Sequence, residues 1–250
     1  MRRSERLATI VDRVTVAGST DVSALALELG VSGATVRRDL QALARDQLVV
    51  RTHGGVSAAK SADGIPVRIR VPPRHEAEKH RIGRAAAALV EDGSVVGMSG
   101  GSTTLEVARA LAERNGITVV TNAINIAAEL VGRTVGLVVV GGIVRHSYEL
   151  VGPAAETMLS RYHFDVGFIG VDGLTDEGAT TYDEMEAQTD LGFLRRSRRR
   201  VIVTDSSKLG RMTFAKIAPL TDVTDLVTDT GADAAHLDPL RNAGVRITVA

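Results

Sequence analysis

The residues with the clearest chemical meaning lie in the segment 31–43, which combines arginine, threonine and glutamine on one predicted helix. Arginine can form two hydrogen bonds to guanine and glutamine two to adenine, while threonine and alanine suit a thymine methyl group or a phosphate. Such a set is typical of a helix that enters the major groove of DNA. The candidate contacts are Ser32, Ala34, Thr35, Arg37, Arg38 and Gln41.

Two helices joined by a tight turn are expected to position these residues. Val36, Leu40 and Leu43 recur at helical spacing and predict one buried face, opposite the candidate contacts. Ser32 can cap this helix, and Gly30 suits the left-handed turn that ends a shorter helix upstream. An earlier apolar pattern predicts a further helix. Together these elements predict a helix-turn-helix, with a solvated basic face on an ordinary helical subdomain as the alternative.

A β-hairpin is predicted directly after this helix. Residues 48–56 are β-prone, turn at the pair Gly54-Gly55 and then resume an apolar pattern. Such a hairpin would be a wing, with Arg51 and His53 facing the DNA backbone or the minor groove. The first 60 residues hold more basic than acidic side chains, although the formal charge of the whole chain is zero. A neutral protein can bind DNA when one module carries the positive field.

Anion binding is the chemistry predicted for residues 99–104, a loop that follows a short apolar strand and opens a helix. Glycines let a ligand approach the backbone, hydroxyls donate hydrogen bonds, and free N–H groups at a helix start favour an anion. The loop lacks the lysine of a P-loop and the spacing of a dinucleotide fingerprint, so a phosphate on a small metabolite fits better. The candidate contacts are Ser99, Gly101, Ser102, Thr103 and Thr104.

Polar residues also follow other predicted strands. Lys208 can balance the charge of a ligand, and Asp172 and Asn122 can bond sugar hydroxyls. Each of these segments can instead be a plain loop, because Gly, Ser, Thr and Asp are ordinary turn residues. The candidate contacts outside the first loop are Thr121, Asn122, Arg145, Asp172 and Lys208.

Short β-branched runs alternate with helical segments from residue 76 to the C-terminus. Continuous apolar strands separated by helices predict a mainly parallel, doubly wound α/β domain, with its ligand site at the carboxyl ends of the strands. The basic run 195–200 is expected to be a solvated helix end, with contact to DNA or phosphate as the alternative. Asp183, Glu184 and Glu186 are expected to form a charged helix start, with catalytic carboxylates as the alternative. Strands are expected at 95–98, 117–120, 137–140, 166–169, 201–203, 226–227 and 245–249.

Composition limits the function classes. Of the 250 residues, 44% are hydrophobic and 3% aromatic, which supports a substantial core of Val, Leu, Ala and Ile. Cysteine is absent, which excludes disulfides, thiol catalysis and thiolate metal sites. The six histidines show no metal-ligand spacing, and no apolar run approaches membrane length. We expect a cytoplasmic protein with no metal, no cofactor and no membrane partner.

The helix and hairpin motifs resemble the DNA-binding domain of the DeoR family of bacterial transcriptional regulators. In that family a winged helix-turn-helix precedes a sugar-phosphate-sensing domain that is similar to ribose-5-phosphate isomerase. The chain departs from the family pattern at Ser99, where an acidic residue is common, and at Asp190, near which a basic residue is frequent. The resemblance rests on Thr35–Leu40, Leu43, Leu48, Arg51, His53–Gly55, Asp92-Gly93, Gly101–Thr103, Thr121-Asn122, Gly141-Gly142, Asp205–Lys208 and Thr228-Asp229.

The resemblance implies a sequence-specific regulator, most often a repressor, with operator DNA and a phosphorylated sugar as partners. The small polar segment 57–64 and the prolines Pro66, Pro72 and Pro73 indicate a linker over 58–75. It separates a winged helix-turn-helix over 1–57 (motif about 20–39) from an effector domain over 76–250. A homo-oligomer, dimer or tetramer, is expected because one helix reads only a few base pairs and paired half-sites multiply specificity.

An enzyme is the alternative function. An isomerase-like protein with an attached DNA-binding module would use Asp172, Glu186 and Lys208 as an acid–base set. Nothing in the sequence pairs these three residues, and a fold does not confer the chemistry of its relatives. We therefore predict a regulator without catalytic residues.

Overall fold

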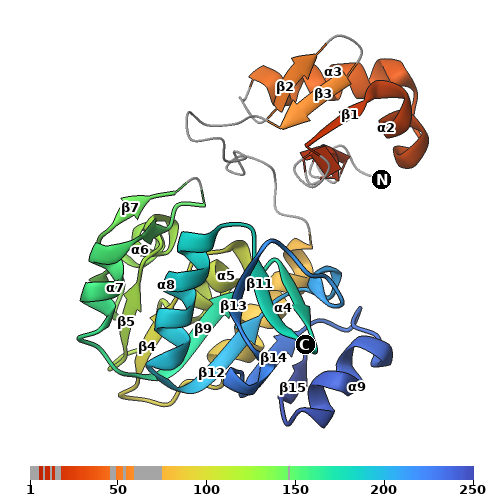
Figure 1. The fold of residues 1–250 in the computed structure, drawn as a ribbon. Helices are drawn as coiled ribbons and strands as arrows, with labels where there is room; N and C mark the ends of the chain where they lie inside the picture. Colours follow the sequence, from red (N-terminus) through yellow and green to blue (C-terminus); the bar gives the residue numbers. More distant parts are fainter. Residues whose placement is uncertain are drawn as a thin grey trace. The chain divides into compact units, whose positions relative to one another are not determined.

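The computed structural model divides the chain into two compact units, Met1–Arg74 and His75–Ala250 (Figure 1). Each unit has its own hydrophobic core. The described residues are 6, 7, 9–11, 13, 14, 18–45, 49–52, 55–58, 75–145 and 147–250.

The N-terminal unit is a helix-turn-helix with a three-stranded antiparallel sheet of order β1-β3-β2. The predicted hairpin is confirmed as β2 paired with β3, whereas β1 was not foreseen. Residues 6, 7, 9–11, 13 and 14 are helical and precede these elements. The elements are β1 (Ser19–Asp21), α2 (Val22–Leu29), α3 (Gly33–Arg45), β2 (Val49–Thr52) and β3 (Gly55–Ala58).

Local hydrogen bonds fix the turn between α2 and α3. Gly30 ends α2 with φ 63°, a left-handed conformation that glycine adopts without strain, as the sequence predicted. The Ser32 hydroxyl accepts a hydrogen bond from the Thr35 N–H at 3.2 Å, which confirms Ser32 as the cap of α3. Val36 and Leu40 are buried in the core of this unit, so the predicted apolar face is also confirmed.

The C-terminal unit is built on a seven-stranded parallel sheet of order β15-β14-β12-β9-β4-β5-β6 (Figure 1). All seven strands were predicted, with boundaries that differ by a few residues. Chain order reverses at the centre, where β4 lies beside both β5 and β9. The strands are β4 (Val95–Met98), β5 (Thr118–Thr121), β6 (Gly136–Val139), β9 (Phe164–Gly170), β12 (Ser197–Val203), β14 (Asp225–Thr228) and β15 (Arg246–Val249).

Helices cover both faces of this sheet, which explains why its strands are apolar on both sides. One core layer contains buried side chains of α4 (Glu76–Ala87), α5 (Ser102–Leu111) and α6 (Ile124–Leu130). The other contains those of α7 (Pro153–Leu159), α8 (Glu184–Arg195) and α9 (Ala234–Asn242). The predicted doubly wound α/β architecture is confirmed.

Several short elements were not predicted, because two to four residues carry too little periodicity to be recognised. A small antiparallel sheet of order β10-β11-β13 packs into the second core layer, and β7 pairs with β8 as a hairpin. These elements are β7 (Ile143–Val144), β8 (Leu150–Val151), β10 (Gly173–Thr175), β11 (Gly178–Thr181), β13 (Ala215–Ala218) and the 3-10 turns η1 (Ser206–Lys208) and η2 (Leu220–Asp222).

The expectation for the basic run 195–200 was partly wrong. The helix α8 does end at Arg195, but Ser197 already begins β12, so the following arginines lie in the sheet. Arg199 donates a hydrogen bond to the buried Asp225 on the neighbouring strand at 2.7 Å. This carboxylate offsets the charge of Arg199 within the sheet.

Gly97 on β4 gives a test of the packing at the centre of the sheet. A Cβ at this position would lie 2.8 Å from the Phe164 ring and 3.0 Å from Phe193, two rings that stack at 5.6 Å. We expect Gly97→Ala to lower the free energy of unfolding by about 1–3 kcal/mol, because this core has no room for a methyl group. Urea denaturation of the variant and the wild type measures this difference in the free energy of unfolding. Gly141→Ala, which meets nothing within 4 Å, is the control and should change stability little.

Candidate DNA-reading surface and effector site

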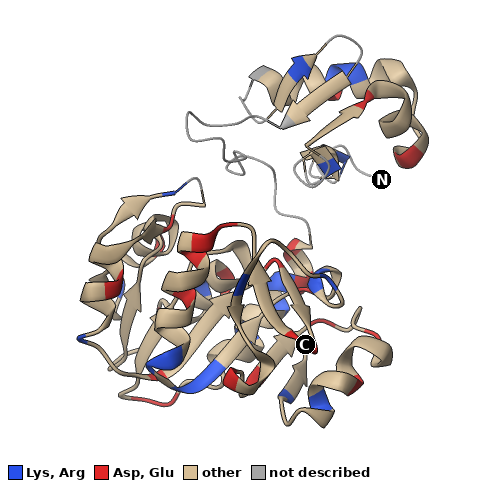
Figure 2. Ribbon diagram, viewed as in Figure 1, with Lys and Arg blue, Asp and Glu red and all other residues tan. Residues whose placement is uncertain are grey.

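The exposed face of α3 presents the predicted base-reading side chains. Ala34, Arg37, Arg38 and Gln41 are exposed, and Thr35 is partly exposed with its hydroxyl hydrogen-bonded to that of Ser32 at 2.9 Å. Figure 2 shows basic residues on α3 and on β2 within this unit. Arg51 on β2 is exposed as well, whereas His53 lies outside the described residues. The structure therefore leaves these side chains available for contact.

A buried ion pair holds α3 to the preceding helical segment. The Arg6 Nε donates to Asp39 Oδ2 at 2.6 Å, and the Asp39 side chain is only 3% exposed. Asp39 adjoins Arg38 in the sequence but points to the opposite side of α3, into the unit. The negative charge of α3 is therefore turned away from its arginine-bearing face, which keeps that face positive.

The second candidate site lies where the parallel sheet changes direction. In doubly wound sheets, ligands bind outside the carboxyl ends of the two strands at such a switch point. Here those strands are β4 and β9, and backbone contacts link their ends. The Ser99 N–H donates to the Phe168 carbonyl at 3.1 Å, and the Gly170 N–H donates to the Ser99 hydroxyl at 3.3 Å.

The loop after β4, which was predicted to bind an anion, leads directly into α5. Gly101 precedes α5 with φ 121°, and no side chain caps the first turn of this helix. The Thr104 hydroxyl donates to the Gly101 carbonyl at 2.9 Å, so it secures the loop. Ser99, Thr103 and Thr104 are buried, whereas Ser102 is exposed. The N–H groups at the start of α5 therefore keep hydrogen-bonding capacity for an anion.

Glu149, a residue that sequence reasoning missed, sits against this loop. It comes from the segment between β7 and β8, and its carboxylate accepts hydrogen bonds from the Gly100 backbone and from the Asn122 amide at 3.2 Å. Its side chain occupies the space where a Cβ of Gly100 would lie, within 2.6 Å. Gly100 is therefore required for this contact. The sequence did not predict the contact, because the short hairpin that carries Glu149 has no recognisable pattern.

Burial raises the pKa of Glu149 to about 8, and the negative charge of Glu186 adds to the effect. Asp190, on α8, has its pKa raised well above the ordinary value by burial and then by the charge of Glu149. The Asp190 carboxyl hydrogen-bonds Ser99, so the two positions at which the chain departs from the family pattern are in contact. With a pKa of about 8, the Glu149 carboxyl is predominantly protonated at pH 7.

Asp172 and Lys208 meet after the ends of β9 and β12. The Lys208 Nζ lies 3.5 Å from Asp172 Oδ1, and the Thr181 hydroxyl donates to the other Asp172 oxygen at 3.1 Å. Thr121 is buried, and its hydroxyl accepts the Ala123 N–H at 3.1 Å. Its hydroxyl is thus part of the turn after β5.

Arg145 is positioned by a helix start. Its guanidinium donates to Asp183, whose other carboxylate oxygen caps α8 through the Met185 and Glu186 N–H groups at 2.9 and 3.1 Å. The predicted charged helix start is thereby confirmed. The Ser147 hydroxyl donates to Glu186 at 2.6 Å, so this segment is tied to α8 twice.

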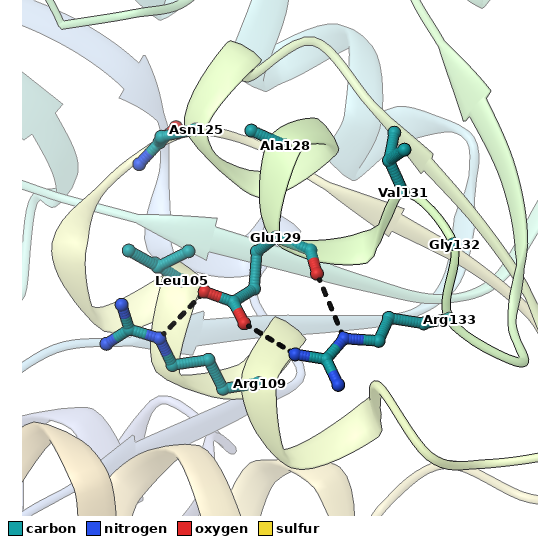
Figure 3. A pocket seen from close by; sticks show the side chains of 8 residues that line it. All are labelled: Leu105, Arg109, Asn125, Ala128, Glu129, Val131, Gly132 and Arg133. Atoms are coloured by element: carbon teal, nitrogen blue, oxygen red, sulfur yellow. Dashed lines mark hydrogen bonds and ion pairs between the residues drawn. The ribbon is translucent and has the colours of Figure 1, made fainter.

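A separate pocket lies between α5 and α6, away from the predicted contacts (Figure 3). Arg109 and Arg133 both point toward Glu129, at 3.1 and 3.6 Å, so its cationic groups are already paired. None of the predicted effector residues lines this pocket.

Among the described residues, no three His, Cys, Asp or Glu side chains are grouped as metal ligands. No helix in this part of the chain is long and apolar enough to cross a bilayer.

Comparison with known protein families decides the identity of both units. Residues 6–62 match the DeoR-like helix-turn-helix domain, and residues 74–230 match the DeoR C terminal sensor domain. The chain belongs to the DeoR family. This DeoR-family protein is a DNA-binding transcriptional regulator rather than an enzyme, which confirms the preferred prediction over its alternative.

Relatives align over nearly the full length of this DeoR-family regulator. A protein of Escherichia coli O157:H7, assigned as an aga operon transcriptional repressor, is 34% identical and aligns over 98% of this chain and 93% of its own. The glycerol-3-phosphate regulon repressor of Escherichia coli K12 is 30% identical over 92% of each chain. Ribose 5-phosphate isomerase A of Methanocaldococcus jannaschii is 19% identical with a TM-score of 0.42, covering 54% of this chain and 55% of that one.

The buried Glu149 carboxyl makes stability depend on pH. Its pKa of about 8 in the folded protein lies above the ordinary value of 4.5, so the folded state binds this proton more tightly. The resulting stabilisation is complete below pH 4.5 and is lost as the pH rises through about 8. We expect the free energy of unfolding to fall between pH 6 and 9, measured by urea denaturation.

Glu149→Gln is the matched variant for this pH effect, because it keeps the shape and removes the titration. The decline between pH 6 and 9 should be shallower in the variant, and Asp190 accounts for what remains. Parallel pH profiles in the two proteins would contradict the assignment.

Proposed function

We propose that the protein represses sugar metabolism genes and that a phosphorylated sugar modulates its binding to operator DNA. The observation that carries this proposal is the anion-suited loop after β4, which lies at the switch point of a domain that matches the DeoR sensor. The E. coli relatives named as repressors of the aga operon and of the glycerol-3-phosphate regulon support it. Its site of action is then the cytoplasm.

The ligand would be held by groups of opposite character. The phosphate would accept hydrogen bonds from the N–H groups at the start of α5, from Ser102 and Thr103, and would pair with Lys208. The sugar hydroxyls would donate to Asp172 and to the Asn122 carbonyl oxygen. Arg145 would act indirectly, because its guanidinium is engaged by Asp183.

Residues 1–57 would read DNA, residues 58–75 would link the units, and residues 76–250 would bind the effector. Operator recognition would need a homo-oligomer, dimer or tetramer, because paired half-sites multiply the specificity of one helix. The effector must bind two arrangements of the protein with different affinity for its binding to change DNA affinity.

Lys79 on α4 offers a contact between the effector site and the start of the C-terminal unit. Its Nζ lies 3.8 Å from Asp205, and both side chains are nearly buried. Asp205 caps the turn η1, which contains Lys208. A shift of Lys208 on ligand binding would therefore be transmitted through Asp205 and Lys79 to α4, the first helix after the proposed linker.

Arg38 tests the DNA-reading half of this proposal. We expect Arg38→Ala to weaken binding to the cognate operator by about 1–3 kcal/mol and to relax the preference at one base pair. Fluorescence anisotropy with operator duplexes that vary one base at a time measures both effects. Arg13→Ala is the control, because Arg13 forms an exposed ion pair with Glu28 in the same unit. An equal loss on every duplex would make Arg38 a phosphate contact.

Lys208 tests the sensing half. Addition of sugar phosphates should change the affinity of the full-length protein for its operator, and Lys208→Met should raise the effector concentration needed by about tenfold or more, as expected for a lost charge-assisted contact. Lys216→Met, an exposed lysine on β13, is the control. If sugar phosphates neither bind nor change operator affinity, the sensing role is wrong.

A further inference from the structure

Four carboxyl groups gather at the effector site. Glu149 comes from the hairpin segment, Asp172 follows β9, and Glu186 and Asp190 lie on α8. Glu149 and Asp190 each interact electrostatically with the other three. We call these four residues the carboxyl cluster. Its members come from three separate segments that the fold brings to the switch point of the sheet.

Cations do not compensate the centre of the carboxyl cluster. Lys208 pairs with Asp172 at its edge, Arg145 pairs with Asp183, and Lys79 with Asp205. Within the described ranges, no ion pair connects Glu149 or Asp190 to a lysine or an arginine. Both carboxyl groups are therefore buried without a positive partner among the residues that the structure describes, an arrangement that favours a cationic ligand.

Two buried acceptor atoms lack a donor, one on Asn122, which contacts Glu149, and one on Asp190. The Asn122 side chain is fully buried and directed at the cluster, because its Nδ2 donates to Glu149, yet its Oδ1 has no hydrogen-bond partner. The Asp190 Oδ1 is also buried without a partner. Unpaired buried acceptors are costly, so these atoms point to a ligand group that brings several donors.

An ammonium group meets both requirements, a positive charge for the buried carboxyls and donors for the unpaired acceptor atoms. It carries a positive charge and three hydrogen-bond donors, whereas a hydroxyl brings one donor and no charge. A metal ion fits less well, because no three acidic or histidine side chains are grouped as metal ligands in the described part of the chain. A sugar phosphate without an amino group would bring no positive charge to Glu149 and Asp190.

We infer that the effector is a sugar phosphate with a free amino group, whose ammonium is bound by Glu149, Asp190 and the Asn122 carbonyl oxygen. This inference rests on the proposed function and names the ligand class of the same site. The phosphate would remain at the start of α5 and near Lys208. Glu149 is then a specificity-determining residue, because it selects an amine over a hydroxyl.

Isothermal titration calorimetry on the full-length protein tests this inference with matched ligands. Glucosamine 6-phosphate is compared with glucose 6-phosphate and with N-acetylglucosamine 6-phosphate, and the galacto-configured pair is measured in the same way. We expect the amino sugar of one pair to bind about 10- to 100-fold more tightly than its hydroxyl counterpart, as a charged hydrogen bond would give. Acetylation should remove this advantage together with the charge.

Proton release gives a second readout that a purely structural role would not produce. Glu149 holds its proton at pH 7 because its pKa is about 8, and a bound ammonium would favour the ionised form. Titrations in buffers of different ionisation enthalpy should show proton release with the amino sugar. Asp190, Glu186 and Asp172 face the same group, so release is expected to shrink rather than vanish in Glu149→Gln.

The variants separate the possible outcomes. Glu149→Gln should reduce the preference for the amine about tenfold or more while hexose phosphate binding persists, and Glu156→Gln, an exposed change on α7, should leave it intact. Equal affinity for amine and hydroxyl ligands in the wild type would overturn this inference and leave the proposed function standing. Absence of binding by every sugar phosphate in the panel would overturn both.

Discussion

The adjacency of β4 and β9 is the constraint on which the C-terminal unit depends. The first strand of the unit lies at the centre of the sheet, and the chain returns to its other side only after β5 and β6. The connections therefore diverge at the carboxyl ends of these two strands, which leaves backbone groups accessible there. Close packing supports the arrangement, because Gly97 on β4 lies against Phe164 and Phe193. This packing fixes the position of β4 and therefore of the loop that follows it.

The sequence predicted the parts of the structure that depend on long, regular patterns. The seven strands of the sheet are continuous apolar runs, and such runs between helices have few alternatives to a covered parallel sheet. Val36, Leu40 and Leu43 likewise define one buried side of α3, so the exposed position of Arg38 followed directly. Asp172 and Lys208 were each expected after a strand, and their contact at 3.5 Å follows because strand ends in such a sheet converge at one edge.

The rest of the site depends on contacts between segments that carry no pattern of their own. Glu149 lies near a hairpin of two-residue strands, where an acidic residue suggests a solvated turn. Asp190 lies within a helix, where an acidic residue suggests a surface position. The burial of Glu149 depends on Gly100, whose missing side chain leaves the space that the Glu149 carboxyl fills. A glycine in a loop indicates freedom of the backbone, but it does not indicate which distant residue will use the space.

The carboxyl cluster also bears on how a ligand could influence the protein. Buried carboxyls without a cationic partner are unfavourable in the free protein, and they become favourable only when a ligand supplies the charge. A ligand can shift an equilibrium between two arrangements only by its difference in affinity for them. Because Glu149 belongs to the segment between β7 and β8, and Asp190 to α8, a cation between them would draw these two segments together. The proposed effector would therefore act by changing the relative position of these two segments. The effect would be measured as a change in the affinity of the positive face of α3 for DNA.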